Sequence, residues 1–405
     1  MNSEALSGLK VLEYSEFISG PHCGKLLADL GAKVIKVEPP GLGDKARRWG
    51  PFPHDEPHPE KSGLFLYLNT NKLGVTLNLE SVAGIKIFRE LAKQVDIVVE
   101  NNPPREMERL GLDYENLHKL NPKLVVTSIT PFGQTGPYRD YKSCDLISAH
   151  MSGETYTNPE AGVDDTESQP PLKPPSHAND FLGGLMGAIC TMSAVIARQV
   201  TGLGQHVDLS QQEAMAYLLC REIGEYNDSG GPFYRGKNRK KALPSEYPCK
   251  NGYISLSMLT DAFWASLSDM MGNPDWAKSE SCRTTVLRNK NWGTIEPKIK
   301  EWTKEHTVEE IVQLAQAKRV PCSPIHSMKE VVNSELLAAR DYFVEFEHRE
   351  AGRIKYPGAP YKLSGTPWRV TCPAPLLGEH NDEVFSQMLG YTRQDLVRMR
   401  QAGVI

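Results

Sequence analysis

The segment Leu9–Glu38, LKVLEYSEFISGPHCGKLLADLGAKVIKVE, is the part of the sequence that decides the fold class. It opens with a short apolar run, Leu9–Tyr14, and closes with a second one, Lys33–Glu38, and both runs are typical of buried strands. Between them, Gly20–Leu30 carries its leucines on one face of a helix, and Gly31 follows as a stop signal. The segment therefore predicts a strand, a helix and a second strand.

The same alternation continues along the chain. Helical spacing over 81–94 is followed by apolar runs at 96–100 and 123–130, which are typical of strands. A long uncharged helix is expected to begin at Asp180, and residues 202–214 offer one more strand and a helix start. Strands that alternate with helices indicate a parallel sheet, so we expect an α/β fold.

The character of the sequence changes near Asp228. A loop with the basic run Arg235–Lys241 comes first, followed by a predicted strand at 253–258 and predicted helices at 262–271 and 308–317. We therefore expect three parts: 1–225 as the first part of a large domain, 226–330 as a smaller α+β domain, and 331–405 as a return to the large domain. The last part is expected to end in a polar helix, Arg393–Gln401.

The composition excludes several classes of protein. Lys plus Arg number 46 against 50 Asp plus Glu, which argues against a basic nucleic-acid binder. With 40% hydrophobic residues, the 405-residue chain is not expected to be disordered. The eight cysteines lack the spacing of a zinc or redox motif, so we expect no metal and reduced thiols in the cytoplasm. The N-terminus shows no signal-peptide pattern, and the uncharged stretch 181–197 is interpreted as a core helix rather than a membrane span.

Asp180 is the residue that elementary chemistry singles out. It stands at the expected start of the long helix, where the helix dipole and free backbone N–H groups favour a carboxylate. One interpretation is a helix cap and nothing more. The other is a carboxylate kept ionised and therefore nucleophilic, with Gly183 and Gly184 allowing a substrate to come close.

Six longer strings occur together in a fixed order. They are Leu9–Glu38, Glu100–Leu112, Ile129–Leu146, Ala178–Met186, Gly204–Glu213 and Leu377–Glu383. Together they strongly resemble the class III CoA-transferases, the group that includes formyl-CoA transferase and carnitine CoA-transferase. The resemblance implies an interlocked homodimer of ring-like chains. Each chain would have a large Rossmann-like domain, made from its N- and C-terminal parts, and a small central domain.

The resemblance also implies functional residues. Asp180 matches the family nucleophile, which forms a mixed anhydride and then an aspartyl-CoA thioester while CoA moves from an acyl-CoA donor to a carboxylic acid. No permanently bound cofactor is implied, since coenzyme A is a substrate. The positions that match CoA contacts are Phe17, Ile18, Lys72, Asn101, Arg109 and Lys142. Arg and Lys can pair with the phosphates of CoA, although a basic residue taken alone is more often a solvated surface charge.

Three departures from the family pattern bear on the substrate. Asn102 stands where relatives often carry an aromatic that packs on the adenine, and Pro39-Pro40 stands where some carry Arg. The polyglycine loop of the formyl-CoA branch is replaced by Arg235–Lys241. We therefore expect a substrate pair other than formyl-CoA and oxalate, with succinate and aromatic or branched acids all open.

Two alternatives remain. The α-methylacyl-CoA racemases share the fold and use the Asp as an acid/base opposite a His, with a Glu in the small domain. The matching positions here are Cys144 and Thr260, which favours transfer because racemisation needs two proton-transfer groups. The other alternative is a binding subunit of a hetero-oligomeric transferase. Backbone N–H groups near Gly183 or Gly230-Gly231 are the expected oxyanion donors.

Overall fold

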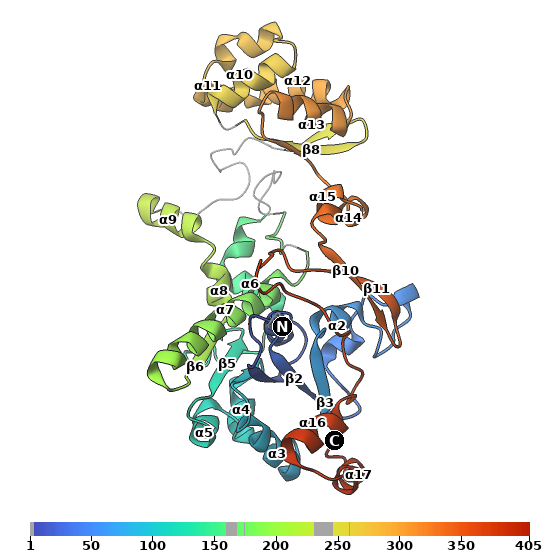
Figure 1. Ribbon diagram of the computed structural model, residues 1–405. Coiled ribbons are helices and arrows are strands. Elements are labelled where there is room, and N and C mark those ends of the chain that lie inside the picture. The colour runs from blue at the N-terminus through green and yellow to red at the C-terminus, as the bar shows by residue number, and fades with distance from the viewer. Residues whose placement is uncertain (1–3, 159–167, 174, 231–245, 259) are drawn as a thin grey trace. The chain divides into compact units, whose positions relative to one another are not determined.

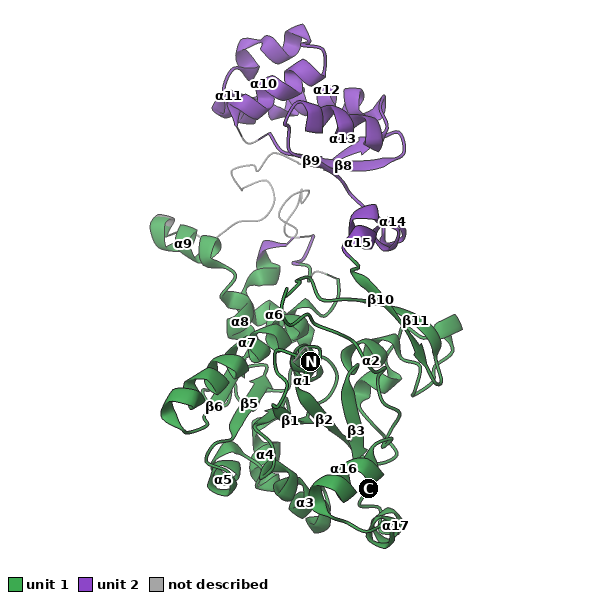
Figure 2. Cartoon of the chain, in the orientation of Figure 1, with its two compact units in different colours: residues 1–156, 172–231, 341–405 green, residues 157–171, 232–340 purple. Residues whose placement is uncertain are grey.

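The computed structural model describes residues 4–158, 168–173, 175–230, 246–258 and 260–405 (Figure 1). The chain forms two compact units (Figure 2). Unit 1 comprises residues 1–156, 172–231 and 341–405, and unit 2 comprises 157–171 and 232–340. The sequence placed the divisions at 225/226 and 330/331. The basic run Arg235–Lys241 lies outside the described residues.

Unit 1 is built on a six-stranded sheet in the order β3-β2-β1-β4-β5-β6, and every neighbouring pair is parallel. The strands are β1 (Lys10–Tyr14), β2 (Lys33–Glu38), β3 (Lys72–Thr76), β4 (Ile97–Glu100), β5 (Val125–Thr130) and β6 (His206–Ser210). The predicted parallel α/β sheet is confirmed.

Both faces of the sheet are buried, which explains why its strands read as continuous apolar runs. Successive residues of β1 point to opposite sides: Val11 joins the cluster under α1 (Ser19–Ala28) and α7 (Ala178–Thr201). Leu12 joins the cluster that includes α3 (Val82–Ala92), α5 (Tyr114–Leu120) and α16 (Asn381–Leu389). The sheet is therefore the middle of three layers.

Helices α1 and α7 approach each other closely on their shared face of the sheet. A Cβ on Gly184 would lie 2.6 Å from the Ser19 carbonyl oxygen, so only glycine permits this contact. His22 of α1 donates from Nδ1 to the Phe181 carbonyl oxygen at 2.9 Å, and burial lowers the pKa of His22 to about 4. By length and composition α7 could cross a membrane, but its glycine-rich face packs on α1 and β5.

The C-terminal segment completes unit 1 at the edge strand β3, where Figure 1 shows α16 beside it. Asn381, the first residue of α16, accepts a hydrogen bond from the Thr76 backbone N–H at 2.8 Å. The last helix, α17, spans Arg393–Gln401 as predicted. A two-stranded antiparallel hairpin, β10 (Phe343–His348) with β11 (Gly352–Pro357), precedes these helices.

The remaining α-helices of unit 1 are short. They are α2 (Gly63–Leu68), α4 (Pro104–Leu110), α6 (Asp145–Ser152), α8 (Gln211–Ala216) and α9 (Cys220–Ser229).

Unit 2 has its own core and mixes a small antiparallel sheet with helices. Its strands, in the order β7-β8-β9, are Glu246–Cys249, Gly252–Leu256 and Cys322–Pro324. Its helices are α10 (Asp261–Met270), α11 (Thr285–Lys290), α12 (Trp292–Lys304), α13 (Val308–Ala317), α14 (Met328–Val332) and α15 (Glu335–Ala339). Thr260 caps α10, because its Oγ1 accepts the Phe263 backbone N–H at 3.2 Å.

Candidate active site

The strand order places a topological switch point between β1 and β4, and ligands of open α/β sheets bind outside the carboxyl ends of the strands at such a point. One side chain ties the two loops that leave these strands. Asn101, directly after β4, accepts from the Glu16 backbone N–H at 2.9 Å and donates to the Glu16 carbonyl oxygen at 2.8 Å. These two hydrogen bonds connect the loop after β1 to the loop after β4 at the opening of the crevice.

A pocket of about 620 Å³ opens at this end of the sheet. Its walls come from the loops after β1, β2, β4 and β5 and from the starts of α6, α7 and α8. The lining residues are Glu16, Phe17, Ser19, Lys45, Trp49, Asn101, Asn102, Pro103, Ile129, Pro131, Ser143, Cys144, Asp145, Leu146, Lys173, His177, Asp180 and Gln211. The size is that of a typical small-molecule site.

Asp180 lies in this pocket, but not at the first residue of its helix. Helix α7 begins at Ala178, so the predicted start at Asp180 is wrong by two residues. The reason is that Ala178 and Asn179 adopt helical geometry after His177, and the Phe181 N–H already bonds to the His177 carbonyl oxygen at 3.0 Å. Asp180 therefore sits in the first turn, where the helix dipole still favours negative charge.

Two neighbours fix the position of Asp180. Its backbone N–H donates to Oδ1 of Asp145 at 3.0 Å, and its own Oδ1 accepts from Nε2 of Gln211 at 2.8 Å. The other carboxylate oxygen, Oδ2, lies 3.6 Å from Nδ1 of His177. Asp180 is only 8% exposed, so these contacts rather than water surround most of the carboxylate.

Three rings form one wall of the pocket. Phe17 meets Trp49 edge-on at a centroid distance of 5.3 Å and His177 at 5.0 Å. Phe17 has a φ of +67°, which is uncommon for a non-glycine residue. Its backbone N–H is held by Oδ1 of Asp44 at 2.8 Å, and this bond helps to keep the loop in that conformation.

A buried cluster of charges lies beneath the loops. Lys36 pairs with Glu13 at 3.1 Å and with Asp44 at 2.7 Å, and Lys72 pairs with Glu13 at 2.8 Å. These side chains are fully buried. Burial lowers the pKa of Lys72 to about 8 against the opposing effect of Glu13. Because Asp44 also holds the N–H of Phe17, the cluster anchors the pocket loop to the sheet.

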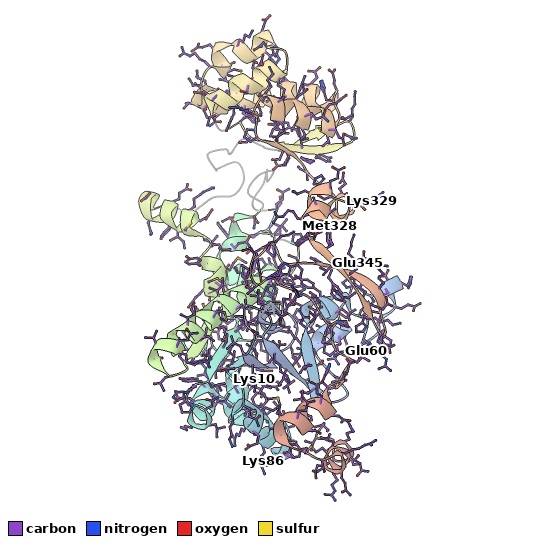
Figure 3. All side chains as sticks on the ribbon, viewed as in Figure 1. Lys10, Glu60, Lys86, Met328, Lys329 and Glu345 are labelled. Carbon is purple, nitrogen blue, oxygen red and sulfur yellow. The ribbon has the colours of Figure 1, made fainter. Side chains whose placement is uncertain are left out.

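A second buried network of the same kind contains Arg47. Its guanidinium pairs with Glu38 through Nε at 2.6 Å and with Glu60, which Figure 3 labels. It also donates to the Pro375 carbonyl oxygen at 3.1 Å. The loop that carries Trp49 is therefore fixed to both β2 and the C-terminal segment of unit 1.

The residues that the sequence proposed as contacts fall into three groups: pocket-lining, buried and surface residues. Phe17 and Asn101 line the pocket with Asp180, whereas Ile18 is fully buried behind it. Lys72 has no exposed side-chain surface, and its Nζ is taken by Glu13, Asn69 and the Pro21 carbonyl oxygen.

The two remaining basic residues lie on the surface outside the pocket wall. Arg109, near the end of α4, is half exposed and pairs with Glu80 and Glu106 at 2.6 Å each. Lys142 is exposed and precedes Ser143, which lines the pocket.

The polar and aromatic pocket residues that sequence reasoning missed include Trp49, Asp145, Lys173, His177 and Gln211. Asp145, His177 and Gln211 lie within or next to strings quoted for the family resemblance, but none carries a motif of its own. The parallel pairing of β5 with β6 brings α8, which follows β6, beside α7, which packs on both strands.

Asp145, His177 and Asp180 offer three ligand atoms within 4.8 Å of one another, a spacing that would suit a metal ion. However, the Lys173 ammonium lies 2.7 Å from Oδ2 of Asp145. A fixed positive charge there already neutralises the carboxylate that a cation would need. The arrangement favours carboxylate chemistry without a metal ion.

The fold and the pocket together define a doubly wound α/β protein with a hydrogen-bonded carboxylate at its switch point. The chain belongs to CoA-transferase family III, whose model matches residues 6–381.

Relatives support the same assignment. The chain is 33% identical over 405 residues to succinyl-CoA–D-citramalate CoA-transferase of Chloroflexus aurantiacus, covering 99% of this chain and 98% of that protein. It is 33% identical over 430 residues to formyl-CoA:oxalate CoA-transferase of Rhodopseudomonas palustris, covering 100% and 98%. A crystal structure of a CaiB/BaiF family protein from Brucella suis superposes with a TM-score of 0.82 at 28% identity, covering 95% of this chain and 100% of that one. The protein is therefore a CoA-transferase, and acyl-CoA and carboxylate substrates fit its family.

Proposed function

We propose that the protein moves coenzyme A from an acyl-CoA donor to a carboxylic acid acceptor through covalent intermediates on Asp180. The observation that carries this proposal is the setting of the carboxylate. Asp145 fixes its backbone and Gln211 holds one oxygen, while Oδ2 is left beside His177 in a 620 Å³ pocket. An oriented carboxylate of this kind is suited to nucleophilic attack.

The reaction proceeds in four steps. Oδ2 of Asp180 attacks the thioester carbonyl and CoA leaves as the thiolate, which gives a mixed anhydride. The thiolate then attacks the carboxyl carbon of Asp180 and expels the donor carboxylate, which gives an aspartyl-CoA thioester. The acceptor carboxylate attacks that same carbon and expels the CoA thiolate, which gives a second mixed anhydride. The thiolate finally attacks the acceptor acyl carbon, breaks its bond to the bridging oxygen and releases the Asp180 carboxylate. One thioester is consumed and one is made.

Coenzyme A is held along the mouth of the switch-point crevice. Arg109 and Lys142 are exposed, so their side chains can be reached from solvent. They bind the CoA phosphates, because both cations form charge-assisted hydrogen bonds with phosphate. Phe17 and Asn101 contact the part that enters the pocket. Ile18 and Lys72 are buried and support the CoA site from behind the loop. Lys72 does so by donating a hydrogen bond to the Pro21 carbonyl oxygen at the start of α1.

The working form is a homodimer in the cytoplasm. An exposed apolar side of α7 supports the dimer, since Leu185, Ile189, Ile196 and Val200 are between 43% and 88% exposed. Patches of this kind mark protein–protein interfaces. All eight cysteines are free thiols, in keeping with a reducing compartment. Turnover by the purified chain alone separates a homodimer from a binding subunit of a hetero-oligomer.

The test uses acyl-CoA donor without acceptor. We expect the peptide that contains Asp180 to gain the mass of CoA, and Asp180→Ala to gain nothing and to lose transfer by at least about 10³-fold. A variant that kept more than a tenth of wild-type turnover, or a wild-type protein without the adduct, would rule out Asp180 as the nucleophile. Succinyl-CoA, formyl-CoA, aromatic and branched donors, each tested against a panel of acids, identify the substrate pair.

A further inference from the structure

We propose that Gln211 is a catalytic residue whose side-chain amide stabilises the negative charge that develops on Oδ1 of Asp180. This inference rests on the proposed covalent mechanism. It assigns Gln211 to the two steps in which the Asp180 carboxyl carbon is attacked, and to neither of the steps in which a substrate acyl carbon is attacked.

The geometry meets the requirements for an oxyanion donor. Nε2 of Gln211 lies 2.8 Å from Oδ1 of Asp180, and the two residues are 4% and 8% exposed. A carboxylate only accepts hydrogen bonds, so the amide nitrogen is the atom that faces it. Fixed donors in a site from which water is largely excluded stabilise developing charge far better than water does.

The fold supplies a rigid support for this amide. Gln211 is the first residue of α8, and that helix is capped by Ser210, whose Oγ accepts the Glu213 backbone N–H at 3.3 Å. The facing position on α7 is Gly183. A Cβ there would lie 3.0 Å from Cγ and 3.3 Å from Nε2 of Gln211, so glycine leaves the space that the amide occupies.

The two described glycines that the sequence suggested as donors have backbone N–H groups that are already engaged. Gly183 lies inside α7, where its N–H belongs to the helical ladder, and the Gly230 N–H is bonded to the Tyr226 carbonyl oxygen at 2.9 Å. Gly231 lies outside the described residues. The Asp180 N–H is taken by Asp145. Among the described side chains, Gln211 is the one that donates a hydrogen bond to the Asp180 carboxylate.

The two carboxylate oxygens of Asp180 have different roles in the reaction. Oδ2 becomes the bridging oxygen of the anhydride and Oδ1 remains the carbonyl oxygen. When the CoA thiolate attacks, a C–S bond forms and the carbonyl electron pair moves onto Oδ1. The tetrahedral carbon then collapses, re-forms the carbonyl and breaks its bond to the bridging oxygen, which leaves as the donor carboxylate. Attack by the acceptor carboxylate on the thioester places charge on the same Oδ1.

The experiment is a rapid-quench single turnover with acyl-CoA donor and no acceptor. It follows free CoA thiol, which reports the first step, and the CoA adduct on the Asp180 peptide, which reports the second. For Gln211→Leu we expect a thiol burst at the wild-type rate and adduct formation slowed about 10²- to 10³-fold. Gln212→Leu is the matched control. Its amide donates to the Met151 carbonyl oxygen at an exposed position, so both rates should stay unchanged.

Two further variants separate chemistry from folding. Gly183→Ala should displace the amide and slow adduct formation while the protein still folds, because the helix propensity of alanine offsets part of the cost of the lost hydrogen bond. In Gln211→Glu, the introduced carboxyl can donate a hydrogen bond to Oδ1 of Asp180 only when it is protonated. The protonated group can donate again, so adduct formation by this variant should recover as the pH falls, a dependence that a structural role would not produce.

The outcomes are distinguishable. Adduct formation by Gln211→Leu within tenfold of wild type, or an equal slowing of thiol release and adduct formation, would overturn the assignment to Gln211 and leave the proposed function intact. A wild-type protein that releases thiol but never carries CoA on Asp180 would overturn the covalent mechanism and this inference together.

Discussion

Oδ1 of Asp145 accepts a hydrogen bond from the backbone N–H of Asp180 at 3.0 Å, which joins the first residue of α6 to the first turn of α7. The donor is one of the N–H groups that a helix start leaves without an internal partner. Asp145 also pairs with Lys173 at 2.7 Å. The carboxylate that caps α7 is therefore itself held in place.

Removing this cap should reduce both stability and activity. For Asp145→Ala we expect a loss of about 0.5–2 kcal/mol in the free energy of unfolding, as for other helix caps. Turnover should fall roughly 10- to 100-fold because the nucleophile is no longer positioned. Asp145→Asn keeps an acceptor oxygen and should retain most of both. Denaturant unfolding and steady-state kinetics measure the two effects, and an alanine variant with wild-type turnover would contradict the positioning role.

Arg109→Ala and Lys142→Ala should raise the KM for CoA esters more than they lower kcat, because contacts remote from the reacting carbon bind ground and transition states alike. Arg109 must leave Glu80 and Glu106 to bind phosphate, so Glu80→Gln should lower the same KM. Lys86→Ala is the control, since Lys86 is an exposed cation on α3 (Figure 3). An unchanged KM in both variants would remove Arg109 and Lys142 from the CoA site.

Glu100 should make stability depend on pH. Burial raises its pKa from 4.5 to about 7, so between these values the folded protein holds a proton that the unfolded chain has released. The stabilisation is fully present below pH 4.5 and is lost as the pH rises through 7. Glu100→Gln lacks this effect. Its free energy of unfolding should equal that of wild type below pH 4.5 and exceed it by up to about 3 kcal/mol above pH 7.

Urea unfolding of both proteins across this pH range measures the difference. A gap between the two proteins that stays constant with pH would show that Glu100 does not titrate in this window. The variant is compatible with the fold, because the amide oxygen of Gln can still accept the Asn102 backbone N–H that Glu100 accepts at 2.7 Å.

The protein should transfer CoA without racemising 2-methylacyl-CoA. Cys144 lines the pocket where a racemase would place its second proton-transfer group, and Thr260 serves as the cap of α10. A thiol has an ordinary pKa near 8.5 against about 6.5 for imidazole. We therefore expect no deuterium at the α-carbon after incubation in heavy water without acceptor. Exchange at a catalytic rate would contradict transfer, and Cys144→Ala should leave transfer unchanged.

The sequence predicted those helices and strands whose local residue pattern is enough to determine the secondary structure. Lys33–Glu38, Val308–Ala317 and Arg393–Gln401 agree with the structure to the residue. Strand β3 was not predicted: KLGVT alternates only two apolar residues, Leu73 and Val75, and the glycine between them weakens the strand signal. Its pairing with β2 and the cover supplied by the C-terminal segment stabilise it, and both are distant in sequence.

The residues of the active site also fall into those that a local pattern predicts and those that it does not. Asp180 could be found because a carboxylate at the start of a helix is a local signal. Asp145 and Gln211 could not, since they are 35 and 31 residues away from it. Their contact with Asp180 depends on how α6 and α8 pack against α7, and the spacing of residues in the sequence does not predict that packing.

The attachment of β3 to the C-terminus has a consequence for biosynthesis. Thr76 and Asn78 of the first half bond to Asn381 and to the Val404 carbonyl oxygen, the latter at 2.8 Å from the Asn78 nitrogen. During translation these partners leave the ribosome long after β3. One edge of the nascent sheet therefore stays uncovered until α16 and Val404 have been made. Removing Val404 and the residue after it should impair folding of a strand made more than 300 residues earlier.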